Sequence, residues 1–205
     1  YKGPGLIAGL EILAKVKKEV GVPVLSDVHC RTEVEKASKV LDVIQIPAFL
    51  CRQTQLALTV GRTNKPINLK KGQFLAPWDM EQVITKIKFT GNDKIILTER
   101  GTCFGYNNLI WDLKSIPIMQ SFGYPVAVDI THIIRRPGIS SEDFSGGSPQ
   151  FISKYAYAEI AVGCDALFIE THVDPKNALC DANSQLKLSK LKKILQEAKK
   201  INELV

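Results

Sequence analysis

The sequence predicts an α/β protein of the (β/α)8 barrel class, also called a TIM barrel, on three observations. Short apolar strands alternate with helices along the whole chain, at intervals of roughly thirty residues. The strands are apolar at nearly every position until their C-terminal ends, where polar residues gather, and the active site of a barrel lies at those ends. A doubly wound sheet, the competing architecture, usually carries a glycine-rich first turn, which this sequence lacks.

Apolar residues at helical spacing and capping signals define the predicted helices. Leu6, Leu10 and Leu13 recur on one helix face, and Gly21 is expected to end that helix. The helices are predicted over residues 6–20, 33–41, 54–60, 81–89 and 151–162, with two more starting near residues 115 and 189. The residues expected to cap helices are Thr32 (with Glu35), Asp79 (with Gln82), Ser115 and Ser189.

Six strands are predicted, over residues 22–28, 43–50, 67–70, 94–98, 125–130 and 166–169. The strand 67–70 places Asn68 and Lys70 on one face, and Lys71 follows before Gly72. A lysine on the inward face of a buried strand is costly unless an anion meets it, so this end is predicted to bind phosphate or carboxylate. The alternative is that both lysines lie on an exposed edge strand.

The number of strands bears on domain organisation. A barrel needs eight strands, or about 250 residues, and this sequence predicts six strands in 205 residues. We therefore expect residues 1–205 to form a single catalytic barrel domain that has six of its eight βα units. Two N-terminal βα units are expected to belong to the natural protein and to be absent from this chain.

Composition limits the classes of partner. The formal net charge is +6, which favours anionic substrates, but the basic residues are dispersed and do not alternate with aromatic residues as in a nucleic-acid binder. No apolar run has the length of a membrane span. Five cysteines without a C-x-x-C pair favour reduced thiols and a cytoplasmic location. We expect small-molecule substrates, with neither nucleic acid nor membrane as a partner.

The polar residues at the predicted strand ends suggest two chemistries. They are Asp27, His29, Gln45, Arg52, Asn68, Lys70, Glu99, Arg100, Asp129, His132, Glu170 and His172. Lys70, Arg100 and Arg52 are cations suited to phosphate groups. His132, Glu170 and Asp181 could together hold a divalent metal, because imidazole and carboxylate are its usual ligands, although a histidine after a strand is more often only hydrogen-bonded.

Four long motifs, in order along the chain, resemble one enzyme family. They are QIPAFLCRQT (45–54), NLKKGQFLAPWD (68–79), TERGTCFGYNNL (98–109) and FIETHVDPKNALCDANSQL (168–186). The chain resembles the 3-deoxy-D-manno-octulosonate 8-phosphate synthase family over essentially its whole length. This resemblance implies a (β/α)8 barrel, usually a homotetramer, that condenses phosphoenolpyruvate with arabinose 5-phosphate and water, releases phosphate, and supplies lipopolysaccharide synthesis.

The resemblance also implies roles for residues at matching positions. Lys70 and Arg100 bind the phosphate of phosphoenolpyruvate, helped by Gln45 and the backbone of Ala48, and Asn68 is a further substrate-binding residue. Asp27 faces the sugar hydroxyls, while Phe49 and Arg52 belong to the motif that reaches a neighbouring subunit's sugar-phosphate site. The metal ligands are His132, Glu170 and Asp181, and the catalytic set is His132, Asp181 and Asp27.

The family has a metal-dependent and a metal-independent branch. The sequences APWD (76–79) and DANSQL (181–186) are more similar to the metal-dependent branch, which implies a divalent metal such as Zn, Fe or Mn. The fourth ligand of that branch, a cysteine, lies in a first strand that this chain lacks. The family's lysine-rich second strand and its Asn-Arg-Ser-Ser loop are also absent, and Lys2 stands where arginine is usual. The chain alone is therefore expected to be inactive.

Three alternatives remain from the sequence. A sister enzyme, 3-deoxy-D-arabino-heptulosonate 7-phosphate synthase, uses erythrose 4-phosphate and shares the ERG motif (99–101), but it does not normally carry PAFLCRQT (47–54). A non-catalytic or truncated homologue would keep the motifs without activity. A basic nucleic-acid binder is the third.

Overall fold

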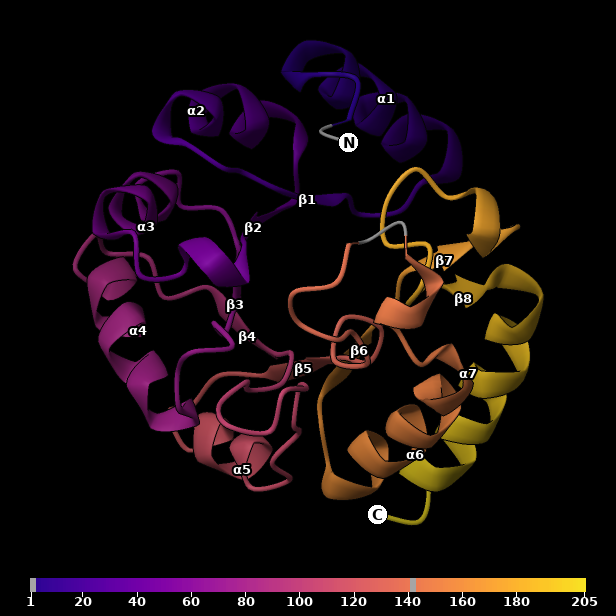
Figure 1. Ribbon diagram of the computed structural model, residues 1–205. Coiled ribbons are helices and arrows are strands. Elements are labelled where there is room, and N and C mark those ends of the chain that lie inside the picture. Colours follow the sequence, from indigo (N-terminus) through magenta and orange to yellow (C-terminus); the bar gives the residue numbers. More distant parts are fainter. Residues whose placement is uncertain (1–2, 141–142) are drawn as a thin grey trace. The chain divides into compact units, whose positions relative to one another are not determined.

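The computed structural model describes residues 3–140 and 143–205 (Figure 1), so Lys2 lies outside the described residues. The chain divides into two compact units. Unit 1 comprises Tyr1–Gly72 and Trp78–Leu97, and unit 2 comprises Gln73–Pro77 and Thr98–Val205.

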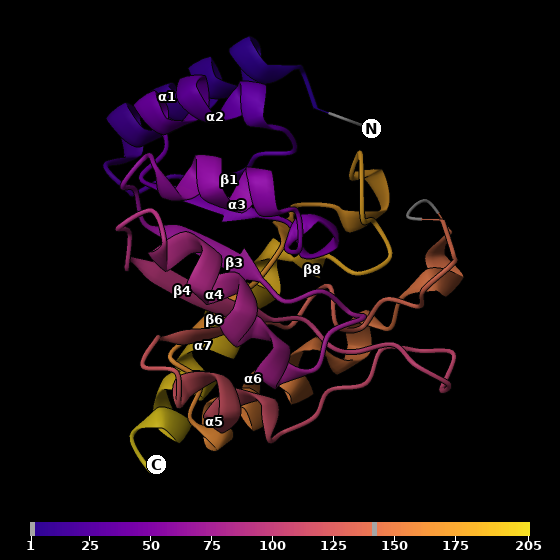
Figure 2. The same ribbon diagram turned by 90° about the vertical axis from the view of Figure 1, so that its left-hand side faces the viewer.

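Unit 1 is built on three parallel strands, β1 (Leu25–Asp27), β2 (Val43–Ile46) and β3 (Ile67–Lys70). Its helices are α1 (Leu6–Val20), α2 (Arg31–Val40), α3 (Thr54–Gly61) and α4 (Met80–Lys88). Figure 2 shows α2, α3 and α4 one after another on the same side of these strands. The core between them contains Ile44, Ile46 and Ile67, all fully buried. The alternation of strand and helix predicted for this part is confirmed.

The fourth strand, β4 (Ile95–Glu99), begins in unit 1 and ends in unit 2. Unit 2 continues with β5 (Val126–Asp129) and β6 (Ala166–Phe168), which pair in parallel, and with α5 (Ser115–Gln120), α6 (Ile152–Val162) and α7 (Leu188–Asn202). α6 and α7 pack against each other. The strands follow one another in the sheet in sequence order, from β1 to β6. A parallel α/β sheet of six strands is consistent with a barrel-like fold, and the full count of eight βα units stays a prediction.

Two strands that the sequence did not predict form a separate small parallel sheet. They are β7 (Thr171–His172) and β8 (Leu186–Lys187), each two residues long. Strands this short have no measurable alternation of apolar and polar residues, which is why the sequence gives no signal for them. Their pairing ties the segment after β6 to the start of α7.

Two predicted strands were too long by four residues each, and the strands predicted over 125–130 and 166–169 were too long by two residues and by one. The strand predicted over 22–28 is β1, Leu25–Asp27, and the strand predicted over 43–50 ends at Ile46. Pro47 follows Ile46, and proline cannot donate a backbone hydrogen bond to a sheet. The chain instead turns into the 3-10 helix η1 (Ala48–Leu50).

Three of the four predicted helix caps were wrong by one or two residues. α2 is capped by Cys30 with Glu33 rather than by Thr32 with Glu35, so it starts earlier than predicted. Lys114 precedes α5, so Ser115 is its first residue, and α7 already contains Ser189. Asp79 does precede α4, without a side-chain hydrogen bond to the helix. Local capping patterns are poor guides here because several polar residues stand close together at each helix start.

Within the described residues, no helix combines the length and the apolar character needed to cross a membrane.

Candidate functional site

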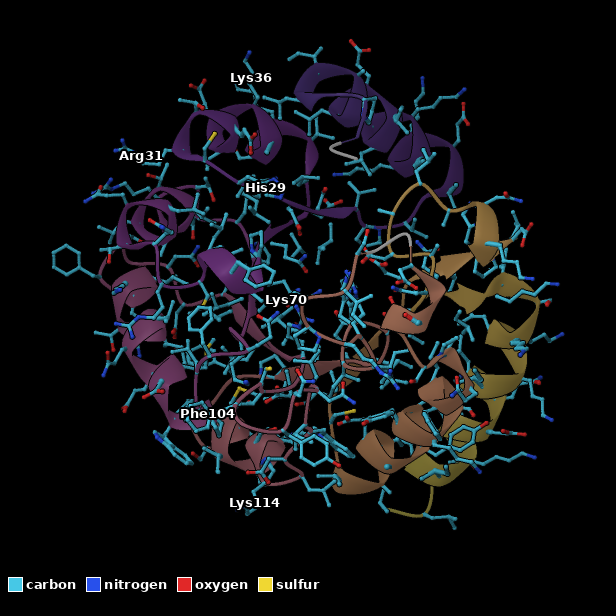
Figure 3. All side chains as sticks on the ribbon, viewed as in Figure 1. His29, Arg31, Lys36, Lys70, Phe104 and Lys114 are labelled. Carbon is cyan, nitrogen blue, oxygen red and sulfur yellow. The ribbon has the colours of Figure 1, made fainter. Side chains whose placement is uncertain are left out.

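The two lysines at the C-terminal end of β3, Lys70 within the strand and Lys71 directly after it, are buried in unit 1. Lys70 is 6% exposed and Lys71 is fully buried, and the Lys71 Nζ donates a hydrogen bond to the Gly72 carbonyl oxygen at 3.3 Å. β3 pairs with β2 on one side, and its other neighbour in the sheet is β4. The alternative of an exposed edge strand is therefore wrong. Figure 3 shows Lys70 on the side of β3 away from α3 and α4.

A row of polar side chains crosses the three strands of unit 1. Asp27, Gln45 and Asn68 are partners in the strand register. The Gln45 Nε2 donates to Asp27 Oδ1, and the Asn68 Nδ2 donates to Gln45 Oε1 at 2.7 Å. Each amide therefore has a fixed direction. Asp27, Gln45 and Asn68, assigned to substrates by resemblance, are indeed brought together.

The other three predicted residues of unit 1 lie in and after η1. Ala48 is buried, whereas Phe49 is 71% exposed and Arg52 is exposed. The buried position of Ala48 follows from its place directly after β2, where the chain is still inside the unit. An exposed phenylalanine beside an exposed arginine leaves both side chains available for contact with another molecule.

The three predicted metal ligands come together in unit 2. One ligand atom from each of His132, Glu170 and Asp181 lies within 4.8 Å of the others. The His132 Nε2 lies 3.5 Å from Glu170 Oε1. All three side chains are partly buried, with exposed fractions of 16%, 27% and 17%. His132 and Glu170 lie 38 positions apart in the sequence. Their spacing in the sequence could not show that they meet, and it is the fold that brings them together.

Asp129, at the end of β5, holds His132 in place. Asp129 is fully buried. Its Oδ1 accepts hydrogen bonds from the backbone N–H groups of Thr131 and His132 and from the Thr131 hydroxyl, and its Oδ2 lies 2.7 Å from His132 Nδ1. A proton on Nδ1 is therefore stabilised by the carboxylate, and Nε2 is the nitrogen that faces Glu170. A carboxylate behind a histidine is the usual support of a metal-binding imidazole.

The backbone around Asp181 and Glu170 is fixed by further hydrogen bonds. Asp181 has a left-handed conformation with φ 51°, and its carbonyl oxygen accepts from Ser184 N at 2.9 Å and Gln185 N at 3.2 Å. Gly147 approaches Asn183 so closely that a Cβ on Gly147 would lie 2.0 Å from the Asn183 carbonyl oxygen. Glu170 N donates to the Thr131 hydroxyl at 3.1 Å. The two carboxylates are thus carried on rigid segments.

Arg100 is a buried cation in the same unit. It is 7% exposed, and its Nη2 donates to the His132 carbonyl oxygen at 3.2 Å. Its Nε has no hydrogen-bond partner among the described residues. Burial lowers the Arg100 pKa, while the nearby Asp129 raises it, and arginine remains charged in proteins. A buried guanidinium with an unused donor is well suited to an anion.

Glu99 fixes the turn that carries Arg100. The Glu99 Oε1 accepts the backbone N–H groups of Arg100 at 2.9 Å and Gly101 at 2.7 Å. Gly101 has φ +85°, and a Cβ there would meet Ile133 Cγ1 at 3.0 Å. This turn therefore requires glycine at position 101.

Sequence reasoning missed two charged residues in unit 2. Arg135 donates to Asp181 Oδ1. Glu159 in α6 is fully buried, its two carboxyl oxygens have no hydrogen-bond partner among the described residues, and burial followed by repulsion from Glu99 raises its pKa to about 10. A signal for Glu159 existed, because Ile152, Ala156 and Glu159 share one helix face. Arg135 gave none beyond following a strand end.

The donor set of His132, Glu170 and Asp181 fits a divalent cation. One imidazole nitrogen and two carboxylate oxygens suit zinc, iron or manganese, and three protein ligands leave positions for water or substrate. Asp129 provides the support behind the imidazole that such sites need. The main evidence that these residues fit a divalent cation is that one ligand atom from each of the three lies close to the other two.

Parallel strands with charged groups at and beyond their C-terminal ends define the class: an α/β protein whose charged side chains gather where the active site of a barrel lies. All 205 residues match the model of the DAHP synthetase I family, and the chain belongs to that family.

Three curated relatives with high identity to this chain carry the same name. The chain is 51% identical to the 2-dehydro-3-deoxyphosphooctonate aldolase of Geobacter sulfurreducens, over all of this chain and 75% of the relative. It is 52% identical to the proteins of the same name from Syntrophotalea carbinolica and Geotalea uraniireducens, over all of this chain and 74% and 75% of them. The resemblance drawn from the four motifs is therefore confirmed.

Proposed function

We propose that the protein condenses phosphoenolpyruvate with D-arabinose 5-phosphate and water to give 3-deoxy-D-manno-octulosonate 8-phosphate and phosphate. The proposal rests on the match of the whole chain, at 51 to 52% identity, to relatives named 2-dehydro-3-deoxyphosphooctonate aldolase. This is another name for 3-deoxy-D-manno-octulosonate 8-phosphate synthase. The alternative reaction with erythrose 4-phosphate is not favoured, because these relatives do not carry its name.

The charged groups of unit 2 support this chemistry. In the reaction, C3 of phosphoenolpyruvate attacks the aldehyde carbon of the sugar, water adds at C2, and the C2–O bond to phosphate breaks. Both substrates are anionic, and Arg100 offers a buried guanidinium to the phosphate of phosphoenolpyruvate. A fixed cation that holds the reactants in register lowers the barrier of a bimolecular step.

Unit 1 contributes its own proposed contacts. Lys70 is proposed to bind phosphate, together with Gln45, Asn68 and the backbone of Ala48, and Asp27 to face the sugar hydroxyls. The hydrogen bonds among Asp27, Gln45 and Asn68 support this proposal, because they fix the orientation of both side-chain amides before a substrate binds. Phe49 and Arg52 are proposed to reach a neighbouring subunit, and their exposure is compatible with such a contact.

We further propose that His132, Glu170 and Asp181 hold a divalent metal, and that His132 and Asp181, with Asp27, belong to the catalytic set. The metal would polarise the sugar aldehyde or orient water. Asp129 would keep His132 Nε2 directed at the site by holding Nδ1. A cytoplasmic homotetramer serving lipopolysaccharide synthesis is the proposed setting, and the five free cysteines are compatible with a reducing compartment.

A phosphate-release assay on the protein at its full natural length tests the reaction. Phosphoenolpyruvate is supplied with either arabinose 5-phosphate or erythrose 4-phosphate, with and without Mn²⁺. We expect release that depends on arabinose 5-phosphate and is at least about tenfold slower with erythrose 4-phosphate, because a site built for the hydroxyl groups of one sugar discriminates against a sugar that lacks one of them. Preference for erythrose 4-phosphate would establish the sister reaction, and no release together with no binding of phosphoenolpyruvate would establish a non-catalytic homologue.

A further inference from the structure

Arg135 lies against one of the three proposed metal ligands. Its Nη1 donates to Asp181 Oδ1, and the two side chains form an ion pair with exposed fractions of 23% and 17%. The same Asp181 is one of three residues whose ligand atoms converge. A guanidinium and a divalent cation would therefore compete for the same carboxylate group.

The rigid partner in this pair is Asp181. Its carbonyl oxygen accepts three hydrogen bonds, from Ser184 N, Gln185 N and Ser184 Oγ, so its backbone cannot turn away easily. Arg135 has a fixed backbone as well, because it forms an antiparallel bridge with Gly147 and its N–H donates to the His132 carbonyl oxygen. Its side chain, however, has several rotatable bonds beyond Cβ. If the pair opens, the Arg135 side chain moves and the carboxylate stays.

The Arg135 guanidinium matches a carboxylate well, because it is a planar cationic donor with several N–H groups. The groups of Asp181 that attract this cation are the same ones that would attract a metal cation. The two cations are therefore expected to compete for Asp181.

We propose that Arg135 is a tethered competitor of the divalent metal: it occupies Asp181 while the metal is absent and must leave Asp181 Oδ1 when the metal binds. This inference rests on the proposed metal site. The consequence is a weakened metal affinity in the natural protein and a carboxylate cluster that stays compensated without metal. The apparent dissociation constant increases by the reciprocal of the fraction of molecules in which Asp181 is open.

The test measures the binding of Mn²⁺ to the chelator-treated protein by electron paramagnetic resonance of the free ion. Mn²⁺ is the probe because five cysteines would also take up Zn²⁺, whereas Mn²⁺ prefers oxygen and imidazole ligands. Three proteins are compared: the natural sequence, Arg135→Gln, and Arg136→Gln as the matched control. Arg136 is exposed and follows directly in the chain.

We expect Arg135→Gln to bind Mn²⁺ roughly tenfold more tightly than the natural protein, as for loss of one charge-assisted hydrogen bond. Arg136→Gln should keep the natural affinity. The thermal midpoint of Arg135→Gln should fall in chelator and recover with Mn²⁺. Equal affinity of the natural protein and Arg135→Gln overturns the proposal, and so does the absence of Mn²⁺ binding in both.

A second pair of proteins tests whether Arg135 acts through its ion pair with Asp181 or only through the long-range electrostatic effect of its charge. In an Asp181→Asn protein, Arg135 has no carboxylate to occupy, so adding Arg135→Gln should change the Mn²⁺ affinity by less than about twofold. The same tightening in both backgrounds would show that Arg135 acts only through its field and would overturn the proposal. Failure of the proposed reaction is read separately, from phosphate release by the natural protein.

Discussion

The polar groups of unit 1 and of unit 2 are held in different ways. In unit 1, Asp27, Gln45 and Asn68 belong to strands and share one register, so the ladder of the sheet places them. In unit 2, the charged groups follow the strands or lie in loops, and buried carboxylates place them: Asp129 holds His132, and Glu99 holds the turn of Arg100. The sheet therefore places the polar row of unit 1, whereas carboxylate hydrogen bonds place His132 and the Arg100 turn of unit 2.

The two regions also differ in charge balance. Around Arg100 and Arg135, unit 2 gathers four carboxyl groups that can be ionised, namely Glu99, Asp129, Glu170 and Asp181. The His132 Nε2 faces Glu170 in the same group. A divalent cation held by His132, Glu170 and Asp181 would add positive charge among these carboxyl groups. Glu159, a further carboxyl of unit 2, has its pKa raised to about 10 by burial and by repulsion from Glu99, so it keeps its proton at neutral pH.

The largest expected effect concerns Glu159. Because its pKa is raised from 4.5 to about 10 in the folded chain, the folded state keeps a proton that the unfolded state loses above pH 4.5. The stability contribution of this group is therefore complete below pH 4.5 and is lost as the pH rises toward 10. We expect Glu159→Gln to raise the free energy of unfolding by up to about 4 kcal/mol at pH 7.5.

Urea unfolding at pH 5 and pH 7.5 measures this difference. The gain in Glu159→Gln should nearly vanish at pH 5, and Glu203→Gln, a control at an exposed glutamate after α7, should change little at either pH. A Glu159→Gln protein that is less stable than the natural protein at pH 7.5 would show that the carboxylate is ionised and compensated.

Arg100→Gln removes the buried cation of unit 2. We expect kcat/KM for phosphoenolpyruvate to fall roughly a hundredfold, since loss of one partner from a buried charge pair costs about 2 to 5 kcal/mol. Steady-state kinetics with varied phosphoenolpyruvate measures the change, and the exposed Arg62→Gln serves as control. An unchanged kcat/KM would remove Arg100 from the substrate site.

Asp129→Asn tests whether a charged support is needed behind His132. An asparagine cannot keep every hydrogen bond that the Asp129 carboxylate accepts, so the imidazole should lose its fixed direction. We expect Mn²⁺ affinity to weaken by about ten- to a hundredfold. Asp165→Asn is the matched control, because that carboxylate accepts the Val126 N–H at the opposite end of β5. If both variants bind Mn²⁺ as the natural protein does, Asp129 has only a structural role.

The smallest expected effect is in the amide row of unit 1. Gln45→Glu replaces the donor to Asp27 by a second carboxylate and should lower the free energy of unfolding by about 1 to 2 kcal/mol. Chemical unfolding at pH 7.5 checks this value, with Gln55→Glu on the exposed side of α3 as control. A loss no larger than that of the control would mean that the row is not a stabilising network.

The sequence predicted the elements that are marked by the periodicity of their apolar residues. It predicted helix caps poorly where several neighbouring residues could each serve as the cap. The strand 67–70 and the helix 6–20 were predicted with their observed bounds, because apolar spacing and a following glycine mark them. The cap at Cys30 was missed, because the neighbouring Thr32 offers an equally good pattern and only the fold selects between them. His132, Glu170 and Asp181 were named by their chemistry and by resemblance, whereas their convergence depends on contacts far apart in the chain.

The central claim, that unit 2 carries a divalent-cation site supported by charged residues, is tested most directly by a crystal structure of the protein grown with Mn²⁺ and measured for anomalous scattering. We predict one strong anomalous peak bonded to His132 Nε2 and to carboxylate oxygens of Glu170 and Asp181, with the Arg135 side chain moved off Asp181 Oδ1. A map with no peak at these three residues, while Arg135 still binds Asp181, would contradict the claim.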